Sequence, residues 1–477
     1  MQMISFVFIG FTAIIFAALY VCNKVLKTDF QKSVAGKWIL LIGSFLFVLY
    51  ADWKFAAVLG ALSVIVWFCA RKKEYIPFGI VAALGSLAFF KYTNFFLDSF
   101  SRLFGKTDYV ALKLILPLGI SFYTFSAISY LIDVKRNKVQ PAALLDVSLY
   151  LSFFPKITSG PIQRSQDFFE QMEKPRQVNW ENFSAGIQIF CFGLFKKIVL
   201  ADRLSVFVNQ VYETPLAFGS FTVFLAMCAY SLQIYFDFSG YSDMAIGVGR
   251  VLDIRLPRNF NLPYLSHNVT ELWKRWHITL SSWLQEYLYI SLGGNRKGTI
   301  RTYINLILTM VLGGIWHGAS WNYIIWGALH GVALAVHKLW SNVTGSGKKK
   351  HSVPANLISI AITFLFTSVC WVFFRAESLE QALLILVQMV SFKPGLQQPY
   401  LWLFFGAIVL CVGSAMAFHF TKDRTLPEKR QNQSFVDGYY PIGDLKTFWG
   451  LVWFFVLCGL IVGLAHTGGS PFIYGAY

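Results

Sequence analysis

The sequence Gly313-Gly314-Ile315-Trp316-His317-Gly318-Ala319-Ser320-Trp321 separates two apolar stretches, Thr302–Leu312 and Tyr323–Val336. The two stretches predict a pair of membrane helices, and the glycines between them would let the pair bend or let a substrate approach the backbone. A titratable imidazole at membrane depth is energetically costly, so an intramembrane histidine is by default a candidate functional residue. The alternative interpretation of His317 is a buried histidine that is bonded to neighbouring backbone.

The composition of the chain is typical of a membrane protein. Of its 477 residues, 56% are hydrophobic and only 14% are charged, whereas soluble domains carry about 25% charged residues. Apolar windows long enough to cross a bilayer recur along the chain, which predicts an all-α polytopic integral membrane protein with many transmembrane helices. Basic residues between these windows account for the net charge of +17. Such residues are topology signals, so nucleic acid is not an expected partner.

The orientation of the helices is predicted from the basic clusters, because basic loops tend to stay in the cytoplasm. Both termini are then expected outside the cytoplasm, and the apolar start Ile4–Val21 is expected to remain as the first helix. Leu379–Val390 is predicted to be an amphipathic helix on the outer surface. The apolar windows away from the centre of the chain predict transmembrane helices near residues 4–22, 38–53, 55–70, 77–97, 109–131, 355–374, 400–420 and 448–466.

The middle of the chain is less regular. Between Leu144 and Arg203 the apolar runs are short and are broken by Pro155, Gly160 and Pro161. Such breaks persist at membrane depth only where protein or a water-filled cavity covers the backbone, so re-entrant or partial helices are expected around a cavity. The polar segment Arg250–Arg301 is too charged to span and predicts helices on the cytoplasmic side. Residues 1–477 are expected to form one membrane domain, with N-terminal helices in 1–131, the core with re-entrant and cytoplasmic-side helices in 132–340, and C-terminal helices in 341–477.

A second histidine, His277, is expected on a helix that begins at Asn268, because Glu271 follows Asn268 at the spacing of a capping pair. On that helix His277 shares a face with Trp273 and Trp276, so its imidazole is expected to point inward. An interfacial position in an aromatic belt explains His277 equally well. Imidazole titrates near neutral pH, so a histidine pair in a polar cavity could deprotonate a hydroxyl that attacks an acyl carbon.

Polar side chains also end one of the apolar runs, in Tyr235-Phe236-Asp237-Phe238-Ser239-Gly240-Tyr241-Ser242-Asp243-Met244. They could line a polar cavity, and ordinary capping of a helix end is an equally good interpretation. Ser159–Arg164 is interpreted as a cytoplasmic turn rather than a ligand site. No metal site is predicted, because neither candidate histidine has a ligand partner at the required spacing. The seven cysteines have no paired spacing and are expected to be packing residues.

Several of these motifs together resemble the membrane-bound O-acyltransferase (MBOAT) family. The resemblance rests on Glu271–His277 with the following Ile278-Thr279-Leu280-Ser281, on the Trp316-His317-Gly318 centre and on Asp237–Asp243. It extends over nearly the whole chain, through Pro117–Phe122, Phe153–Arg164, Phe373–Ala376 and Ser470–Tyr474. Within the family the chain is similar to the bacterial polysaccharide branch, that of the alginate and peptidoglycan O-acetyltransferases. The related D-alanyl transferases of teichoic acid modification share the two histidine motifs.

The resemblance implies a bundle of about 11 transmembrane helices, with re-entrant and amphipathic helices, around a central funnel that meets a cytoplasmic tunnel near the bilayer centre. It implies that His317 is the central catalytic histidine and His277 its catalytic partner. Lys274 and Arg275 are candidates to hold the phosphates of a donor. The residues expected to line the cavity are Trp316, Ser320, Trp321, Asn322, Asp237, Tyr241, Ser242 and Trp276.

The resemblance further implies an O-acetyltransferase of the cytoplasmic (inner) membrane. Acetyl-CoA is the expected co-substrate on the cytoplasmic side, and no bound cofactor is expected. The acetyl group is expected to reach a polysaccharide or cell-wall acceptor with the help of an extracytoplasmic partner that has an SGNH-type, Ser-His-Asp esterase-like domain. The alternative functions are D-alanyl transfer from a carrier protein, a transporter or flippase of an acylated carrier, and a scaffold for polymer export.

Overall fold

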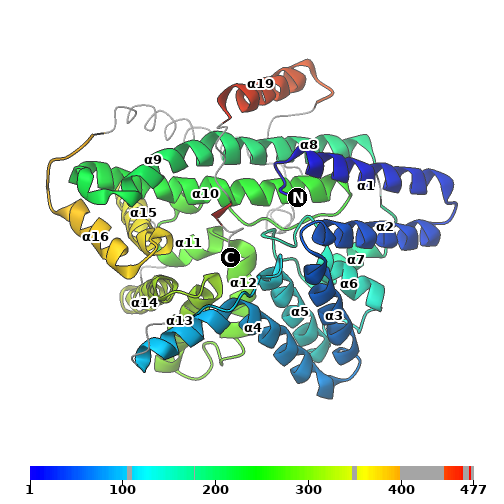
Figure 1. Cartoon of the computed structure of the whole chain (residues 1–477), viewed down its shortest axis with the longest axis horizontal. Coiled ribbons are helices and arrows are strands. Elements are labelled where there is room, and N and C mark those ends of the chain that lie inside the picture. Colours follow the sequence, from blue (N-terminus) through cyan, green and yellow to red (C-terminus); the bar gives the residue numbers. More distant parts are fainter. Residues whose placement is uncertain (105–109, 177, 346–351, 398–444, 466–471, 474–477) are drawn as a thin grey trace.

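The computed structural model describes the chain except for residues 105–109, 177, 346–351, 398–444, 466–471 and 474–477 (Figure 1). Every named regular element of the described residues is a helix. Elements η1, η3 and η4 are 3-10 helices, whereas η2 and η5 are π-helices. In chain order the elements are α1 (Phe6–Val25), α2 (Asp29–Leu49), α3 (Trp53–Cys69), η1 (Lys73–Tyr75), α4 (Ile76–Leu103), α5 (Ile120–Lys135), α6 (Leu144–Ser152), α7 (Ser165–Met172), α8 (Trp180–Leu194), η2 (Phe195–Ala201), α9 (Asp202–Glu213), η3 (Pro215–Ala217), α10 (Ser220–Val251), η4 (Pro263–Leu265), α11 (Val269–Arg275), α12 (Ile278–Trp283), η5 (Leu284–Tyr289), α13 (Thr299–His317), α14 (Trp321–Thr344), α15 (Val353–Arg375), α16 (Leu379–Val390) and α19 (Phe448–Leu464).

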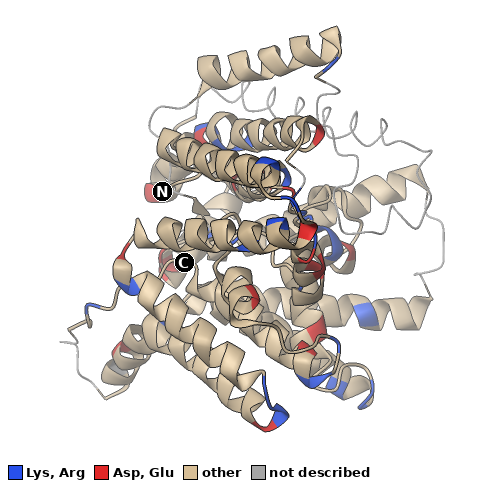
Figure 2. Cartoon of the chain, turned by 90° about the vertical axis from the view of Figure 1, so that its right-hand side faces the viewer, with Lys and Arg blue, Asp and Glu red and all other residues tan. Residues whose placement is uncertain are grey.

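Seven helical runs in the described part of the chain are long and apolar enough to cross a membrane, and α3, α16 and α19 are shorter apolar helices. In Figure 2 the helices are largely free of charged residues, which lie mainly toward helix ends and in loops. The predicted class, an all-α polytopic membrane protein, is thereby confirmed. The helices predicted near 355–374, 379–390 and 448–466 are α15, α16 and α19. The helix predicted near 400–420 lies outside the described residues.

The predicted start of the fifth helix, at residue 109, was wrong. The helix α5 begins only at Ile120 and contains 16 residues, most of them buried. Pro117 disfavours helical backbone at the residue before it, and Gly119 adopts a left-handed conformation with φ of 75°. A Cβ atom at Gly119 would overlap the carbonyl oxygen of Ile157. The glycine therefore allows the turn formed by residues 153–164 to pack directly against the start of α5.

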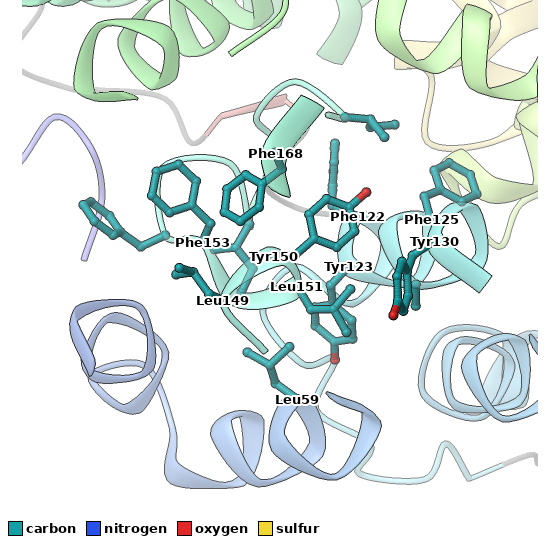
Figure 3. Packing of buried hydrophobic residues seen from close by; sticks show 14 of the residues in the cluster. Leu59, Phe122, Tyr123, Phe125, Tyr130, Leu149, Tyr150, Leu151, Phe153 and Phe168 are labelled. Carbon is teal, nitrogen blue, oxygen red and sulfur yellow. The ribbon is translucent and has the colours of Figure 1, made fainter. Parts of the chain in front are cut away.

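Short helices and an irregular turn occupy residues 144–172, as the prolines and glycines predict. Figure 3 shows the rings of Tyr150, Phe153 and Phe168 gathered there, and the centroid of Phe168 lies 5.5 Å from that of Tyr150 and 5.6 Å from that of Phe153.

Broken helices were predicted as far as Arg203, and for the residues from 180 onward this prediction was wrong. The elements α8, η2 and α9 form one helical run over residues 180–213, because no proline interrupts it.

Glycines allow α8 and α10 to lie in backbone contact, and Figure 1 shows the two helices side by side across the molecule. A Cβ at Gly186 would lie 2.6 Å from the carbonyl oxygen of Gly247, and a Cβ at Gly193 would lie 2.5 Å from that of Gly240. Membrane helices associate through van der Waals packing of this kind, because lipid supplies no hydrophobic drive between them. The contact fixes α10, which carries Asp237, against the helical run over residues 180–213.

The helices α13 and α14 form a hairpin that is packed in the same way. A Cβ at Gly314 would overlap the carbonyl oxygen of Tyr323, and a Cβ at Gly327 would overlap that of Met310. Small residues therefore let the two backbones meet along the hairpin. Because His317 is the last residue of α13, this contact determines where its imidazole lies.

The substitution Gly327→Ala is expected to destabilise the protein by about 1–3 kcal/mol, because the added methyl group must push α13 away from α14. Gly85→Ala is the matched control, since Gly85 also lies in a helix but has open space where a Cβ would be. The control is expected to change stability by less than about 1 kcal/mol. Titration of the detergent-solubilised variants with SDS measures both values, and equal losses would contradict the importance of the contact.

Candidate active site

His317 is enclosed by aromatic side chains from three helices. Its side chain is 2% exposed, and its ring centroid lies 4.8 Å from that of Trp316, 5.1 Å from that of Trp326 and 5.2 Å from that of Phe374. Trp326 belongs to α14 and Phe374 to α15. Gly318 takes extended backbone directly after His317 and ends α13 there. The histidine thus lies at the turn of the hairpin rather than in the middle of a helix.

Two side chains of α4 hold the end of α13, and the sequence prediction missed both. The Lys91 Nζ donates to the carbonyl oxygen of Trp316 at 2.5 Å, and the Tyr92 hydroxyl donates to that of Ile315 at 2.8 Å. Both carbonyls belong to the last turn of α13, where no intrahelical partner exists. The available signal was a lysine inside the apolar stretch of α4, since an ionisable residue in a membrane helix is a functional candidate.

His277 lies at a break between two short helices. The single helix predicted through His277 was wrong: α11 ends at Arg275, and His277 is the N-cap of α12 with φ of 42° and ψ of 54°. The predicted cap is confirmed, because the Asn268 side chain accepts from the backbone N–H of Glu271 at 2.9 Å. A left-handed conformation is unfavourable for a residue with a Cβ, and such strain is often found at functional sites.

Asn259 connects His277 to α10. Its Oδ1 lies 3.3 Å from the His277 Nδ1 and accepts from the Thr279 hydroxyl at 2.6 Å. Its Nδ2 donates to the Ser242 hydroxyl at 3.0 Å. Because Oδ1 is an acceptor, this arrangement favours the tautomer in which Nδ1 carries the proton and Nε2 is the basic nitrogen. The sequence prediction included Ser242 but missed Asn259.

The two candidate histidines are connected through packed indole rings. Trp276, the residue before His277, lies 4.9 Å from Trp371, and Trp371 stacks on Trp326, whose ring lies 5.1 Å from that of His317. His277 is outside the candidate membrane-spanning helices, and burial lowers the pKa of its imidazole to about 3. The His277 ring is therefore neutral near physiological pH, and a neutral imidazole can accept a proton or a hydrogen bond. Within the described residues no group of three or more His, Cys, Asp and Glu side chains is placed to hold a metal ion.

Asp237 and Tyr241, predicted to line a cavity, tie other segments to α10. The Asp237 Oδ1 accepts from the Lys197 Nζ at 2.6 Å, and its Oδ2 accepts from the backbone N–H of Ile473 at 2.8 Å. The Tyr241 hydroxyl is hydrogen-bonded to Thr158. Both side chains are buried. They fasten the 472–473 segment and the 153–164 turn beside the His277 network.

Of the three predicted residues that follow His317, two form hydrogen bonds within the protein and one is exposed. The Ser320 hydroxyl caps α14 by accepting from the Asn322 backbone N–H at 3.3 Å, and the Asn322 Nδ2 donates to the carbonyl oxygen of Ala376 at 2.8 Å. Trp321 is 61% exposed, and its ring lies 6.3 Å from that of Phe95. Ser320 and Asn322 therefore shape the turn, whereas Trp321 faces away from the enclosed imidazole.

The remaining predicted residues lie in or near the aromatic packing. Trp316 stacks on Phe125 with centroids 4.9 Å apart, and Trp276 lies 4.9 Å from Trp371. Lys274 is exposed. The Arg275 guanidinium is paired with the Glu271 carboxylate at 2.7 Å. The structure thus gathers Trp316 and Trp276 around the two histidines and leaves the two cations nearer the surface.

Comparison with known proteins matches the part of the chain that contains the candidate active site to one protein family. The sequence matches the profile of the membrane-bound O-acyltransferase (MBOAT) family over residues 65–374. It is 42% identical over 349 residues to a peptidoglycan O-acetyltransferase of Helicobacter pylori, a match that covers 68% of this chain and 66% of that protein. It is 40% identical over 374 residues to a probable alginate O-acetylase of Pseudomonas putida, which covers 74% of each chain. A teichoic acid D-alanyltransferase of Bacillus subtilis is 30% identical over 55% of this chain and 69% of its own.

The left-handed backbone at His277 has a measurable consequence. His277→Gly is expected to be more stable than His277→Ala by about 1 kcal/mol. In the left-handed conformation the alanine Cβ lies too close to the backbone, whereas glycine has no Cβ. At Ser281, inside α12, the order is expected to reverse, with Ala more stable than Gly by about 1 kcal/mol. Unfolding of the four variants in SDS–detergent mixtures measures the two differences. Greater stability of the Ala variant at both positions would show that His277 is not strained.

Proposed function

Because this chain belongs to the membrane-bound O-acyltransferase family, we propose that it transfers acetyl groups to hydroxyls of an extracytoplasmic polysaccharide or of peptidoglycan. Transfer to a partner protein that acetylates the polymer is the second form of the same proposal. The names of the Helicobacter pylori and Pseudomonas putida relatives support the acetyl group and the class of acceptor. The observation that carries the proposal is the enclosed His317 at the end of α13, with the buried His277 connected to it through the packed rings of Trp276, Trp371 and Trp326.

In this proposal His317 is the general base. Its imidazole takes the proton of the acceptor hydroxyl while the hydroxyl oxygen attacks the acyl carbon of a donor thioester. The new C–O bond forms, the C–S bond breaks, and the proton passes from the imidazole to the leaving sulfur. His277 assists by holding the donor, because its favoured tautomer presents Nε2 as a hydrogen-bond acceptor. Polarisation of the thioester carbonyl would need the other tautomer.

The proposed donor is acetyl-CoA, bound from the cytoplasmic side. Its phosphates need cations, and Lys274 and Arg275 lie at the end of α11, three and two residues before His277. Lys274 is exposed, whereas Arg275 is engaged by Glu271. Lys274 is therefore the better placed of the two for a flexible phosphate contact.

The proposed cellular setting follows from the charge pattern and from the acceptor. The protein is placed in the cytoplasmic membrane with both termini outside the cytoplasm, because basic loops tend to stay inside. An extracytoplasmic partner with an SGNH-type esterase-like domain would receive the acetyl group and pass it to the polymer. This arrangement brings a cytoplasmic thioester and an extracytoplasmic hydroxyl to one buried imidazole.

Two other functions would use the same site differently. A D-alanyl transferase would take its acyl group from a carrier protein, and the Bacillus subtilis relative favours this alternative. A transporter or flippase of an acylated carrier would use the cavity without breaking a thioester. The first would transfer D-alanine but not acetyl groups, and the second would keep a donor-independent flux after loss of His317.

His317→Ala is expected to lower acetyl transfer by about 10²–10⁴-fold while the protein remains folded, because a general base contributes about that factor. The assay supplies labelled acetyl-CoA to the reconstituted protein and follows label in water-soluble and polymeric acceptors. His337→Ala is the control, since His337 is half-buried on α14 and bonds to the Thr270 hydroxyl. Equal rates in wild type and His317→Ala would reject the general base. Wild-type protein that releases no label to water or acceptor would reject acetyl-CoA as donor.

A further inference from the structure

Lys91 is an unusual residue for its position on α4. The helix runs over residues 76–103 and is apolar enough to cross a membrane, where an ammonium group is costly without partners. The Lys91 Nζ donates to the Trp316 carbonyl oxygen at 2.5 Å and to the Ser121 hydroxyl at 3.4 Å. It also lies 5.6 Å from the centroid of the Trp316 ring. The ammonium is thus directed at the residue that precedes His317.

The chemistry of a helix end explains this direction. The aligned peptide dipoles give the C-terminus of α13 a partial negative charge, so a cation is stabilised there. The Trp316 carbonyl belongs to the peptide group whose nitrogen is that of His317. A hydrogen bond to this oxygen therefore restrains the plane from which the His317 side chain projects. Tyr92 restrains the preceding peptide through the Ile315 carbonyl, but it carries no charge.

We propose that Lys91 is a positioning residue for His317: it binds the Trp316 carbonyl, orients the last peptide of α13 and thereby holds the imidazole in place for transfer. A hydrogen bond from a charged donor is stronger than one from a neutral hydroxyl. Lys91 therefore contributes more to the position of His317 than Tyr92 does. The kinetic part of this inference rests on the proposed acetyl transfer, whereas the structural part does not.

The kinetic test compares Lys91→Met, Lys91→Arg and Tyr92→Phe with wild type, using labelled acetyl-CoA and reconstituted protein. Lys91→Met is expected to lower kcat by about 10–100-fold, because displacement of a catalytic group by about 1 Å has an effect of this size. The KM for acetyl-CoA is expected to stay within about 2-fold, since Lys91 orients the base and does not hold the donor. Lys91→Arg is expected to recover most of the rate, and Tyr92→Phe to lose less than about 5-fold.

A second measurement does not depend on acetyl transfer. Diethyl pyrocarbonate modifies accessible neutral imidazoles, and mass spectrometry follows the modification of His317 in each variant. Faster modification in Lys91→Met than in Lys91→Arg or Tyr92→Phe is the expected result. Unchanged modification together with a kcat within about 2-fold of wild type would overturn the role of Lys91. Equal losses of kcat in all three variants would also overturn the role of Lys91, because they would indicate general loosening of the end of α13. If wild type transfers no acetyl but the modification rates differ as expected, the proposed function fails and the positioning role stands.

Discussion

Backbone contact between α13 and α14 is the constraint on which the arrangement of the site depends. Gly314 and Gly327 have no side chain to hold the helices apart, so each faces a carbonyl of the other helix. The contact brings Trp326 of α14 against the His317 ring, and Trp326 in turn stacks on Trp371 of α15 with centroids 5.7 Å apart. One close helix pair thereby sets the aromatic surroundings of His317. A longer distance between the axes would leave the imidazole exposed to lipid or water.

Three lysines within the bundle show how the fold accommodates cations where water is scarce. Lys197 on the π-helix η2 is fully buried and pairs with Asp202 at 2.9 Å and with Asp237 at 2.6 Å. The Lys156 Nζ lies over the rings of Tyr150 and Phe168, at 4.1 and 4.5 Å from their centroids. Lys91 instead uses the carbonyl end of a helix. An unpaired buried cation is costly, so each lysine fixes the element that supplies its partner. In the case of Lys91 that element carries His317.

The sequence was sufficient to predict what depends on composition and on local signals. Apolar windows gave the membrane class, and the resemblance to the MBOAT family is confirmed by the family match over residues 65–374. The cap at Asn268 and the helix Leu379–Val390 depend on short-range patterns and were correct. The break at His277 was missed, because residues 269–283 read as one amphipathic helix. The strained backbone there is stabilised by tertiary hydrogen bonds, such as that from the Ile278 N–H to the Asn259 carbonyl oxygen, and these bonds cannot be predicted from local sequence.

The same limit explains the site residues that were missed. Asn259 and Lys91 lie 18 and 226 residues before the histidines they support, so no spacing rule connects them. Trp321 follows His317 by four residues, yet it is exposed because the helix ends at Gly318 and α14 runs in a new direction. Local pattern predicts which residues share a face of one helix. It cannot predict which faces meet after a turn.

The aromatic enclosure of the two histidines bears directly on how transfer would proceed. His317 is 2% exposed and His277 is 1% exposed, and exclusion of water protects a reactive acyl donor from hydrolysis. An imidazole so enclosed cannot contact a hydroxyl until some of the surrounding rings move. The α13 and α14 backbones are in direct contact at their glycines, and the Lys91 bond ties the end of α13 to α4, so the movement falls to side chains such as Trp316 and Phe374. A rigid backbone with movable rings would admit the acceptor without displacing the base.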